Sequence, residues 1–128
     1  MGRDRVAAIA ASHHVLAVHD VAATAAWWIE RMGFDRWAEP EGWVFVRRGG
    51  CAIRLGQCPE AIAPAALGDH QYFAYVVVDD VDAYHAEVAP WGVDILAGPA
   101  DTPWGMREMA VRTPDGHRVM FAEKMSGA

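Results

Sequence analysis

The sequence predicts an α+β protein built from two tandem βαβββ modules. Both halves of the chain show the same order of segments, namely one strand, one helix and then three strands. Equivalent residues recur at a steady spacing, since Gly33 matches Gly92 and Arg47 matches Arg112. A segment rich in proline, alanine and glycine, residues 57–70, lies between the halves. These observations favour an internally duplicated module.

Module one begins with an apolar run, Val15 to Val18, that has the character of a strand. Asp20 is placed to cap a helix over VAATAAWWIERMG, where apolar residues recur at helical spacing and Gly33 is a left-handed terminator. The expected strands after it are FDRWAE, WVFVRR and CAIRL, with turns at PEG and GG.

Module two repeats this order. YFAYVVV is a strand, and Asp79 or Asp80 caps a helix over VDAYHAEVAPWG, with Gly92 near its end. The remaining elements are VDILAG, MREMAVR and RVMFAE, the last two joined by the turn TPDGH. We place module one at about residues 12–56 and module two at about 71–124.

The composition bounds the class of protein. A chain of 128 residues forms one domain with a real core, here residues 1–128. The net charge of −6 disfavours a nucleic-acid partner, and no apolar run reaches membrane-spanning length. Cys51 and Cys58 flank an extended segment and are too far apart for a disulfide, so we expect reduced thiols in a cytoplasmic protein.

The hairpin at Gly49 and Gly50 predicts which side chains share a face. A two-residue turn pairs Phe45 with Arg54, and directly opposed residues lie on one side of a sheet. The side expected against the helices is aliphatic: Val44, Val46, Ile53 and Leu55, and by the repeat Met109, Val111, Val119 and Phe121. The other side is a candidate ligand wall: Trp43, Phe45, Arg47, Ala52 and Arg54, with Glu108, Ala110, Arg112, Arg118, Met120 and Ala122 in module two.

Paired βαβββ modules, the opening HVLAVHDV and the closing WGMREMAVRTPDGHRVMFAEK resemble the vicinal oxygen chelate superfamily. That group includes glyoxalases, ring-cleaving dioxygenases and the fosfomycin and bleomycin resistance proteins. The resemblance covers about residues 12–124. It implies a curved eight-stranded mixed sheet around a concave cavity, helices on the convex side, and a homodimer. On the same basis we place His14, Leu16 and Val18, and Phe73, Tyr75 and Val77, on the cavity side.

The resemblance also supplies a test for a metal centre. Metal-dependent members hold the ion with His and Glu on the first and last strands of each module. Here those positions fall on His14, Arg54, Phe73 (Ala74 if the register shifts by one) and Met120. A guanidinium, a phenyl ring and a thioether are poor ligands for a hard or borderline divalent ion. We therefore expect no metal and no cofactor.

Other chemistry is possible at two side chains. Glu108 is a candidate general base if an apolar cavity raises its pKa, although a salt bridge to Arg54, Arg112 or Arg118 is the favoured reading. Cys51 is a candidate nucleophile only with a histidine beside it, and a small buried thiol is the favoured reading.

The preferred hypothesis is a metal-free protein, with no catalytic residue, that sequesters a planar or amphipathic small molecule. The cavity is expected to be lined by His14, Trp43, Phe45, Arg54, Phe73, Tyr75, Trp104, Glu108 and Met120. Trp43 and Trp104 fill the cavity or the dimer contact if they do not bind ligand. The alternatives are a metal-dependent lyase, transferase or dioxygenase of the same superfamily, and a scaffold or regulatory dimer whose cavity is closed by its own side chains.

Overall fold

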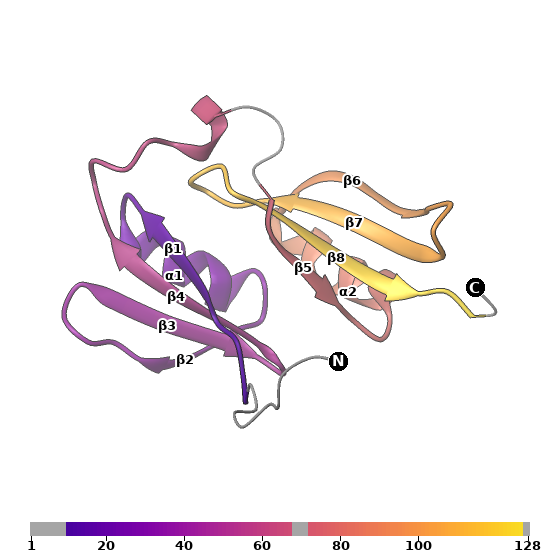
Figure 1. Ribbon diagram of the computed structural model, residues 1–128, viewed down its shortest axis with the longest axis horizontal. Coiled ribbons are helices and arrows are strands. Elements are labelled where there is room, and N and C mark those ends of the chain that lie inside the picture. The colour runs from indigo at the N-terminus through magenta and orange to yellow at the C-terminus, as the bar shows by residue number, and fades with distance from the viewer. Residues whose placement is uncertain (1–9, 68–71, 127–128) are drawn as a thin grey trace, which may run out of the picture.

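A computed structural model describes residues 10–67 and 72–126, and its elements follow the predicted order (Figure 1). Module one contains β1 (His14–Val18), α1 (Val21–Glu30), β2 (Asp35–Ala38), β3 (Trp43–Arg48) and β4 (Cys51–Gln57). Module two contains β5 (Tyr72–Val77), α2 (Val81–Val88), β6 (Asp94–Asp101), β7 (Met106–Arg112) and β8 (Arg118–Lys124). Short 3₁₀ turns lie at Pro64–Leu67 and Ala89–Trp91.

The strands form two four-stranded mixed sheets, in the orders β1-β4-β3-β2 and β5-β8-β7-β6. In each sheet the first strand runs parallel to the last, and the other neighbours are antiparallel. The α+β class and the tandem βαβββ modules are therefore confirmed. The edge strands β1 and β5 face each other across the junction between the modules (Figure 1), where the rings of His14 and Phe73 are 5.7 Å apart.

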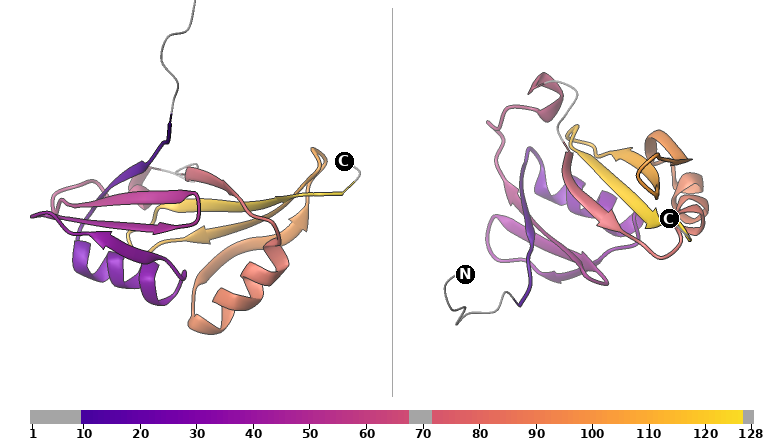
Figure 2. Two further views of the ribbon diagram at one scale, coloured as in Figure 1. Left: turned by 90° about the horizontal axis from the view of Figure 1, so that it is seen from below. Right: turned by 45° about the vertical axis from the view of Figure 1, so that its right-hand side comes forward.

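Both helices cover the same side of the sheets (Figure 2). We call the opposite side of each sheet the open face of its module. The aliphatic set predicted to face the helices is buried in both modules: Val44, Val46, Ile53, Leu55, Met109, Val111, Val119 and Phe121. Trp28 on α1 is fully buried among them and contacts Phe34 and Phe73 edge to face. The core thus lies between helices and sheets, as the alternation requires.

Local signals act as expected at the helix ends. The Asp20 carboxylate accepts a hydrogen bond from the Ala23 amide at 3.1 Å, and Asp80, rather than Asp79, does the same for Ala83 at 3.0 Å. Gly33 and Gly92 both have a φ of 76°, the left-handed conformation that glycine adopts without steric cost. These caps fix where each helix begins and where the chain turns into the next strand.

The central hairpin also has the predicted register. Arg48 pairs with Cys51, Phe45 with Arg54 and Trp43 with Gly56. Gly49 in the turn has a φ of 54°. The open face of module one therefore carries Trp43, Phe45 and Arg54 together.

The predicted side of β1 was wrong. The parallel register sets His14 beside Ile53 and Leu16 beside Leu55, so His14, Leu16 and Val18 face the helices. Leu16 and Val18 are buried in the core, and Val15 and Ala17 face the open side. The physical reason is burial, because the larger aliphatic side chains of β1 pack under α1.

Phe73 also departs from the predicted cavity side. The β5–β8 register shifts between Tyr72 and Ala74, and a strand irregularity of this kind re-aims the side chain it contains. The Phe73 ring consequently packs at the junction, against Trp28, His14 and His117. Beyond the bulge, Tyr75 and Val77 pair with Met120 and Ala122 and face the open side, as predicted.

Polar contacts join the modules on the helix side. Arg48 donates to both carboxylate oxygens of Glu87 at 2.6 and 2.9 Å, and to the Met32 carbonyl at 2.9 Å. This ion pair lowers the pKa of Glu87. At the other end of the junction, the His19 amide donates to Asp115 at 2.8 Å. None of the described helices is long and apolar enough to cross a membrane.

Candidate functional site

The open face of module one carries a group of cationic and aromatic side chains, which we call the module-one cluster: His13, Trp37, Trp43, Phe45, Arg47 and Arg54. Arg54 lies over the Phe45 ring, with 4.3 Å between its guanidinium carbon and the ring centroid. The Trp37 ring lies beside Phe45 at 5.3 Å and receives two guanidinium groups, Arg47 at 5.2 Å and Arg54 at 5.8 Å. Cations placed over aromatic faces are attracted by the ring quadrupole.

A histidine orients the central arginine of this cluster. The Arg54 Nε–H donates to His13 Nδ1 at 3.0 Å, which requires that nitrogen to be unprotonated. The His13 ring meets the Trp37 ring edge to face at 5.7 Å. With Nε engaged, the two terminal nitrogens of Arg54 have no hydrogen-bond partner among the described residues.

Trp43 completes the cluster, and the position of its ring depends on Gly56, the residue opposite to it on β4. Its indole is 38% exposed and contacts Phe45 edge to face at 6.2 Å. The six-membered ring lies flat on the backbone of Gly56, where an added Cβ would come within 2.9 Å of it. Gly56 is needed here for close approach of a ring to the strand.

The open face of module two carries a smaller and acidic group, the module-two cluster: Tyr75, Trp104 and Glu108. The Tyr75 hydroxyl donates to Glu108 Oε2 at 2.6 Å, and the Trp104 indole N–H donates to the same oxygen at 2.9 Å. Burial, followed by the hydrogen bond to Glu108, raises the pKa of Tyr75 to about 12. The phenol therefore keeps its proton at neutral pH and donates a hydrogen bond to this carboxylate.

The favoured salt bridge from Glu108 to an arginine was wrong. Arg112 pairs with Asp94 at 2.9 Å, Arg54 contacts His13, and Arg118 lies over the Tyr72 ring at 6.0 Å. Glu108 instead accepts hydrogen bonds from two neutral donors, Tyr75 on β5 and Trp104 in the loop before β7. The Cys51 thiol is half-buried, and burial raises its pKa, which disfavours the thiolate that a nucleophile requires.

The predicted site residues thus separate into three places. Trp43, Phe45 and Arg54 meet on module one, whereas Tyr75, Trp104 and Glu108 meet on module two with Met120 opposite Tyr75. His14 and Phe73 lie at the junction instead.

Sequence reasoning missed His13 and Trp37. The sequence analysis placed His14 on the open side of β1, and by alternation this would turn its neighbour His13 away from that side. Trp37 lies at a register shift between Arg36 and Ala38, where alternation along a strand no longer predicts direction.

Two hollows of the described chain lie at the junction between the modules. A groove of about 510 Å³ lies on the helix side of the junction, beside Arg48, Tyr84 and Glu87. A smaller hollow of about 250 Å³ lies beside Ile62, Phe73 and His117. Six of the nine predicted lining residues border neither hollow: Trp43, Phe45, Arg54, Trp104, Glu108 and Met120.

The side chains at the family's metal positions do not fit a divalent ion. With β1 corrected, the open-face histidine is His13, and its Nδ1 already accepts from Arg54. The other positions offer a guanidinium at Arg54, a phenyl ring at Phe73 (or a methyl group at Ala74) and a thioether at Met120. These groups are a poor donor set for a hard or borderline ion.

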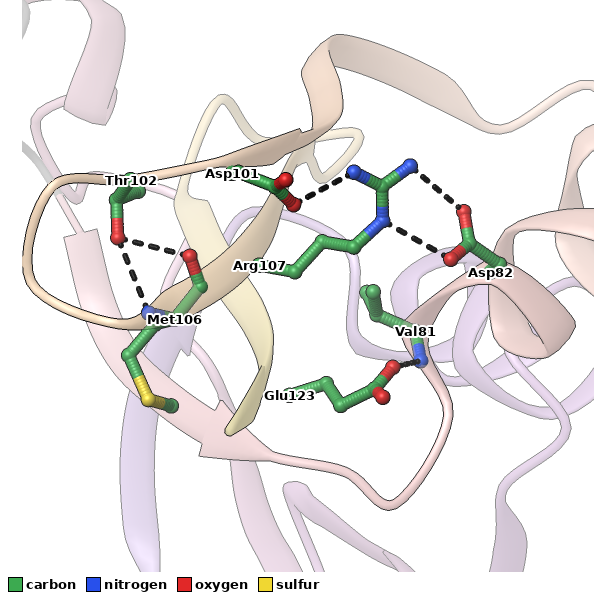
Figure 3. Close-up of polar contacts among 7 residues, drawn as sticks. All are labelled: Val81, Asp82, Asp101, Thr102, Met106, Arg107 and Glu123. Atoms are coloured by element: carbon green, nitrogen blue, oxygen red, sulfur yellow. Dashed lines mark hydrogen bonds and ion pairs between the residues drawn. The ribbon is translucent and has the colours of Figure 1, made fainter. Parts of the chain in front are cut away.

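One acidic group lies elsewhere, at the start of α2, and Figure 3 shows two of its members, Asp82 and Glu123. Oxygens of Asp80, Asp82 and Glu123 approach within 4.8 Å of one another. Each has a structural partner: Asp80 caps α2, Asp82 pairs with Arg107 at 2.9 Å, and Glu123 accepts from the Val81 amide at 2.9 Å. Arg107 also pairs with Asp101 at 2.8 Å. These contacts anchor the helix to β7 and β8.

The fold defines a class of protein with two tandem βαβββ modules, each with one open sheet face. The chain belongs to the Glyoxalase/Bleomycin resistance protein/Dioxygenase superfamily, whose family model matches residues 10–121. No curated protein matches the sequence.

Several solved structures are similar to this chain. The bleomycin-binding protein from Streptomyces verticillus, solved with copper(II)-bleomycin, is 26% identical, with a TM-score of 0.72 over 96% of this chain and 100% of that one. TioX from Micromonospora sp. ML1 is 26% identical, with a TM-score of 0.71 over 89% and 99%. TnmS3, an antibiotic binding protein from Streptomyces sp. CB03234, is 26% identical, with a TM-score of 0.70 over 91% and 99%.

Proposed function

We propose that the protein binds a planar aromatic small molecule on its open sheet faces and holds it without chemical conversion, metal or cofactor. The module-one cluster is the observation that carries this proposal. Rigid rings and guanidinium planes on an exposed sheet face provide large contact area at low entropic cost. The similarity to antibiotic-binding proteins supports the same conclusion. The two free thiols fit a reducing compartment such as the cytoplasm.

We propose further that the partner which encloses the ligand is a second copy of the chain. The open faces expose large apolar side chains, including Val15 at 62%, Val77 at 65% and Trp104 at 67%. Such exposure on a sheet marks a surface that another body covers. The module-one cluster is cationic and the module-two cluster is anionic, so module one of one copy is complementary to module two of another.

A ligand screen tests the binding proposal. Thermal-shift and calorimetric measurements over a set of planar aromatic compounds are expected to find stabilising ligands, since a ligand that binds only the folded state raises the melting temperature. Trp43→Ala is expected to weaken binding of a confirmed ligand by about fivefold, because one exposed ring contact contributes about 1 kcal/mol. Trp91→Ala is the control, since Trp91 is exposed at the end of α2 and away from both clusters. A screen without any stabilising compound, or a ligand indifferent to Trp43→Ala, would contradict the proposal.

Two measurements test its other parts. Size-exclusion chromatography with light scattering is expected to give a dimer, and Val77→Lys is expected to favour the monomer by placing a charge on the covered face. A wild-type monomer at micromolar concentration would exclude the homodimer.

Metal analysis of protein purified without chelators is expected to find less than one ion per chain. A stoichiometric divalent ion would favour the metal-dependent lyase, transferase or dioxygenase alternative.

A further inference from the structure

The arginines of the described chain differ in how their charge is balanced. Four of them have a carboxylate at 2.6–3.0 Å: Arg36, Arg48, Arg107 and Arg112. Arg47 and Arg54, both in the module-one cluster, have no carboxylate at ion-pair distance within residues 10–67 and 72–126. Their contacts are aromatic rings and, for Arg54, one neutral imidazole nitrogen. Two uncompensated cations are therefore held near one indole on a protein whose net charge is −6.

The contacts of Arg54 also determine which of its N–H groups remain available. A guanidinium has five donors in a plane, and a carboxylate binds best to two parallel donors on one edge. The Arg54 Nε–H is used by His13, and its guanidinium carbon lies 4.3 Å from the centroid of the Phe45 ring and 5.8 Å from that of Trp37. The edge formed by its two terminal nitrogens remains. The ring contacts and the His13 bond restrain the side chain before a ligand arrives, which reduces the entropic cost of binding.

We propose that the module-one cluster selects planar aromatic oxyanions, above all aromatic carboxylates. The anion would accept from Arg54 and Arg47, and the attached ring would lie against Trp43. This inference rests on the proposed binding function and specifies the ligand class for the same surface. The acidic chain disfavours anions that lack a ring, since the long-range charge repels them. Recognition therefore requires both the charge and the ring.

Three naphthalene probes that differ only in one substituent test this inference by calorimetry at low ionic strength: naphthoate, naphthamide and naphthylmethylammonium. Naphthoate is expected to bind about tenfold more tightly than naphthamide, as two charge-assisted hydrogen bonds replace neutral ones. Arg47→Gln and Arg54→Gln are each expected to reduce this preference to about threefold or less. Arg112→Gln, the equivalent position in module two, is expected to leave it unchanged because that guanidinium is already paired with Asp94. Melting temperatures verify that each variant is folded.

The outcomes separate this inference from the proposed function. If naphthamide binds as tightly as naphthoate, or if the preference survives in the Arg47→Gln, Arg54→Gln double variant, the selection for oxyanions is wrong, although the surface still binds rings. Preferred binding of naphthylmethylammonium would overturn it as well and indicate the module-two cluster. If none of the probes binds, and the broader screen of aromatic compounds also finds no ligand, both the inference and the binding function are wrong.

Discussion

Asp35 and Arg47 occupy the same cross-strand positions in module one as Asp94 and Arg112 in module two. In module two the pair forms an ion pair at 2.9 Å. In module one it does not, and Arg47 lies instead over the Trp37 ring. The backbone register is the same in both cases. The choice between a carboxylate and a ring is therefore made by a neighbouring side chain.

That neighbour sits at an equivalent irregularity in each module. The register shifts between Arg36 and Ala38 on β2, and between Ile95 and Ala97 on β6. The residue at the shift is Trp37 in module one and Leu96 in module two. An indole attracts a guanidinium, whereas an isobutyl group cannot. The equivalent bulges thus carry different side chains. The one in module one supplies a ring that contacts Arg47, and the one in module two does not.

A second pair of positions shows the same contrast. Trp43 faces Gly56 in module one, and Glu108 faces Ala122 in module two. The indole lies on the bare glycine backbone, while Glu108 is bound by Tyr75 and Trp104. Duplication therefore preserved the β-sheet geometry while the two open faces came to carry different side chains at equivalent positions.

The largest effect on stability is expected from Gly56→Ala, which gives module one the residue that module two has at the equivalent position, Ala122. Gly56→Ala places a methyl group at 2.9 Å from the Trp43 ring, so the ring must shift away from this position. We expect a loss of about 1–2 kcal/mol in the free energy of unfolding, measured in urea, together with weaker ligand binding. The reciprocal Ala122→Gly is expected to cost about 0.5–1 kcal/mol through backbone freedom, and the loss of a fully buried methyl group adds to this cost. Unchanged stability and unchanged ligand affinity in Gly56→Ala would show that the contact between Trp43 and Gly56 contributes to neither.

A smaller effect is expected from Trp37→Leu, which gives module one the residue of module two. The variant removes the ring beneath Arg47 and Arg54, a loss of about 1 kcal/mol or less in unfolding free energy. Arg47 is then expected to pair with Asp35, as Arg112 pairs with Asp94. A structure of the variant reports the new contact directly. If Arg47 stays unpaired, strand geometry rather than Trp37 keeps the two residues of module one apart.

The smallest effect on stability is expected from Glu108→Gln in module two. Removing the carboxylate charge is expected to lower the pKa of Tyr75 from about 12 toward its ordinary value of 10. Ultraviolet absorbance of the phenolate measures the shift, and Tyr75→Phe assigns it. An unchanged Tyr75 titration would mean that burial alone determines its proton affinity.

Much of the fold was predictable because local rules determine it. The caps at Asp20 and Asp80 and the left-handed glycines Gly33 and Gly92 follow from backbone sterics and hydrogen bonding within one turn. The register of the β3–β4 hairpin follows from its two-residue turn. Once the register is known, the aliphatic residues identify the buried side, since only that side removes apolar surface from water.

The candidate site was less predictable because its contacts join strands that local rules do not connect. The side of β1 depends on a parallel pairing with β4, about 40 residues later in the chain, and no turn sets such a register. The direction of Phe73 and of Trp37 depends on bulges, which insert a residue and break the alternation. The partners of Glu108 depend on a tyrosine from β5 and a tryptophan from a loop.

The sequence by itself determined the duplicated βαβββ order, the helix ends, the hairpin register and the aliphatic side of both sheets. Each of these depends on residues that are neighbours in the chain or across a tight turn. Tertiary structure alone decided that His13 and Trp37 join Arg54, and that Glu108 meets Tyr75 and Trp104 instead of an arginine. Long-range pairing and bulges set those contacts, because the side on which a side chain lies reverses with a shift of one residue.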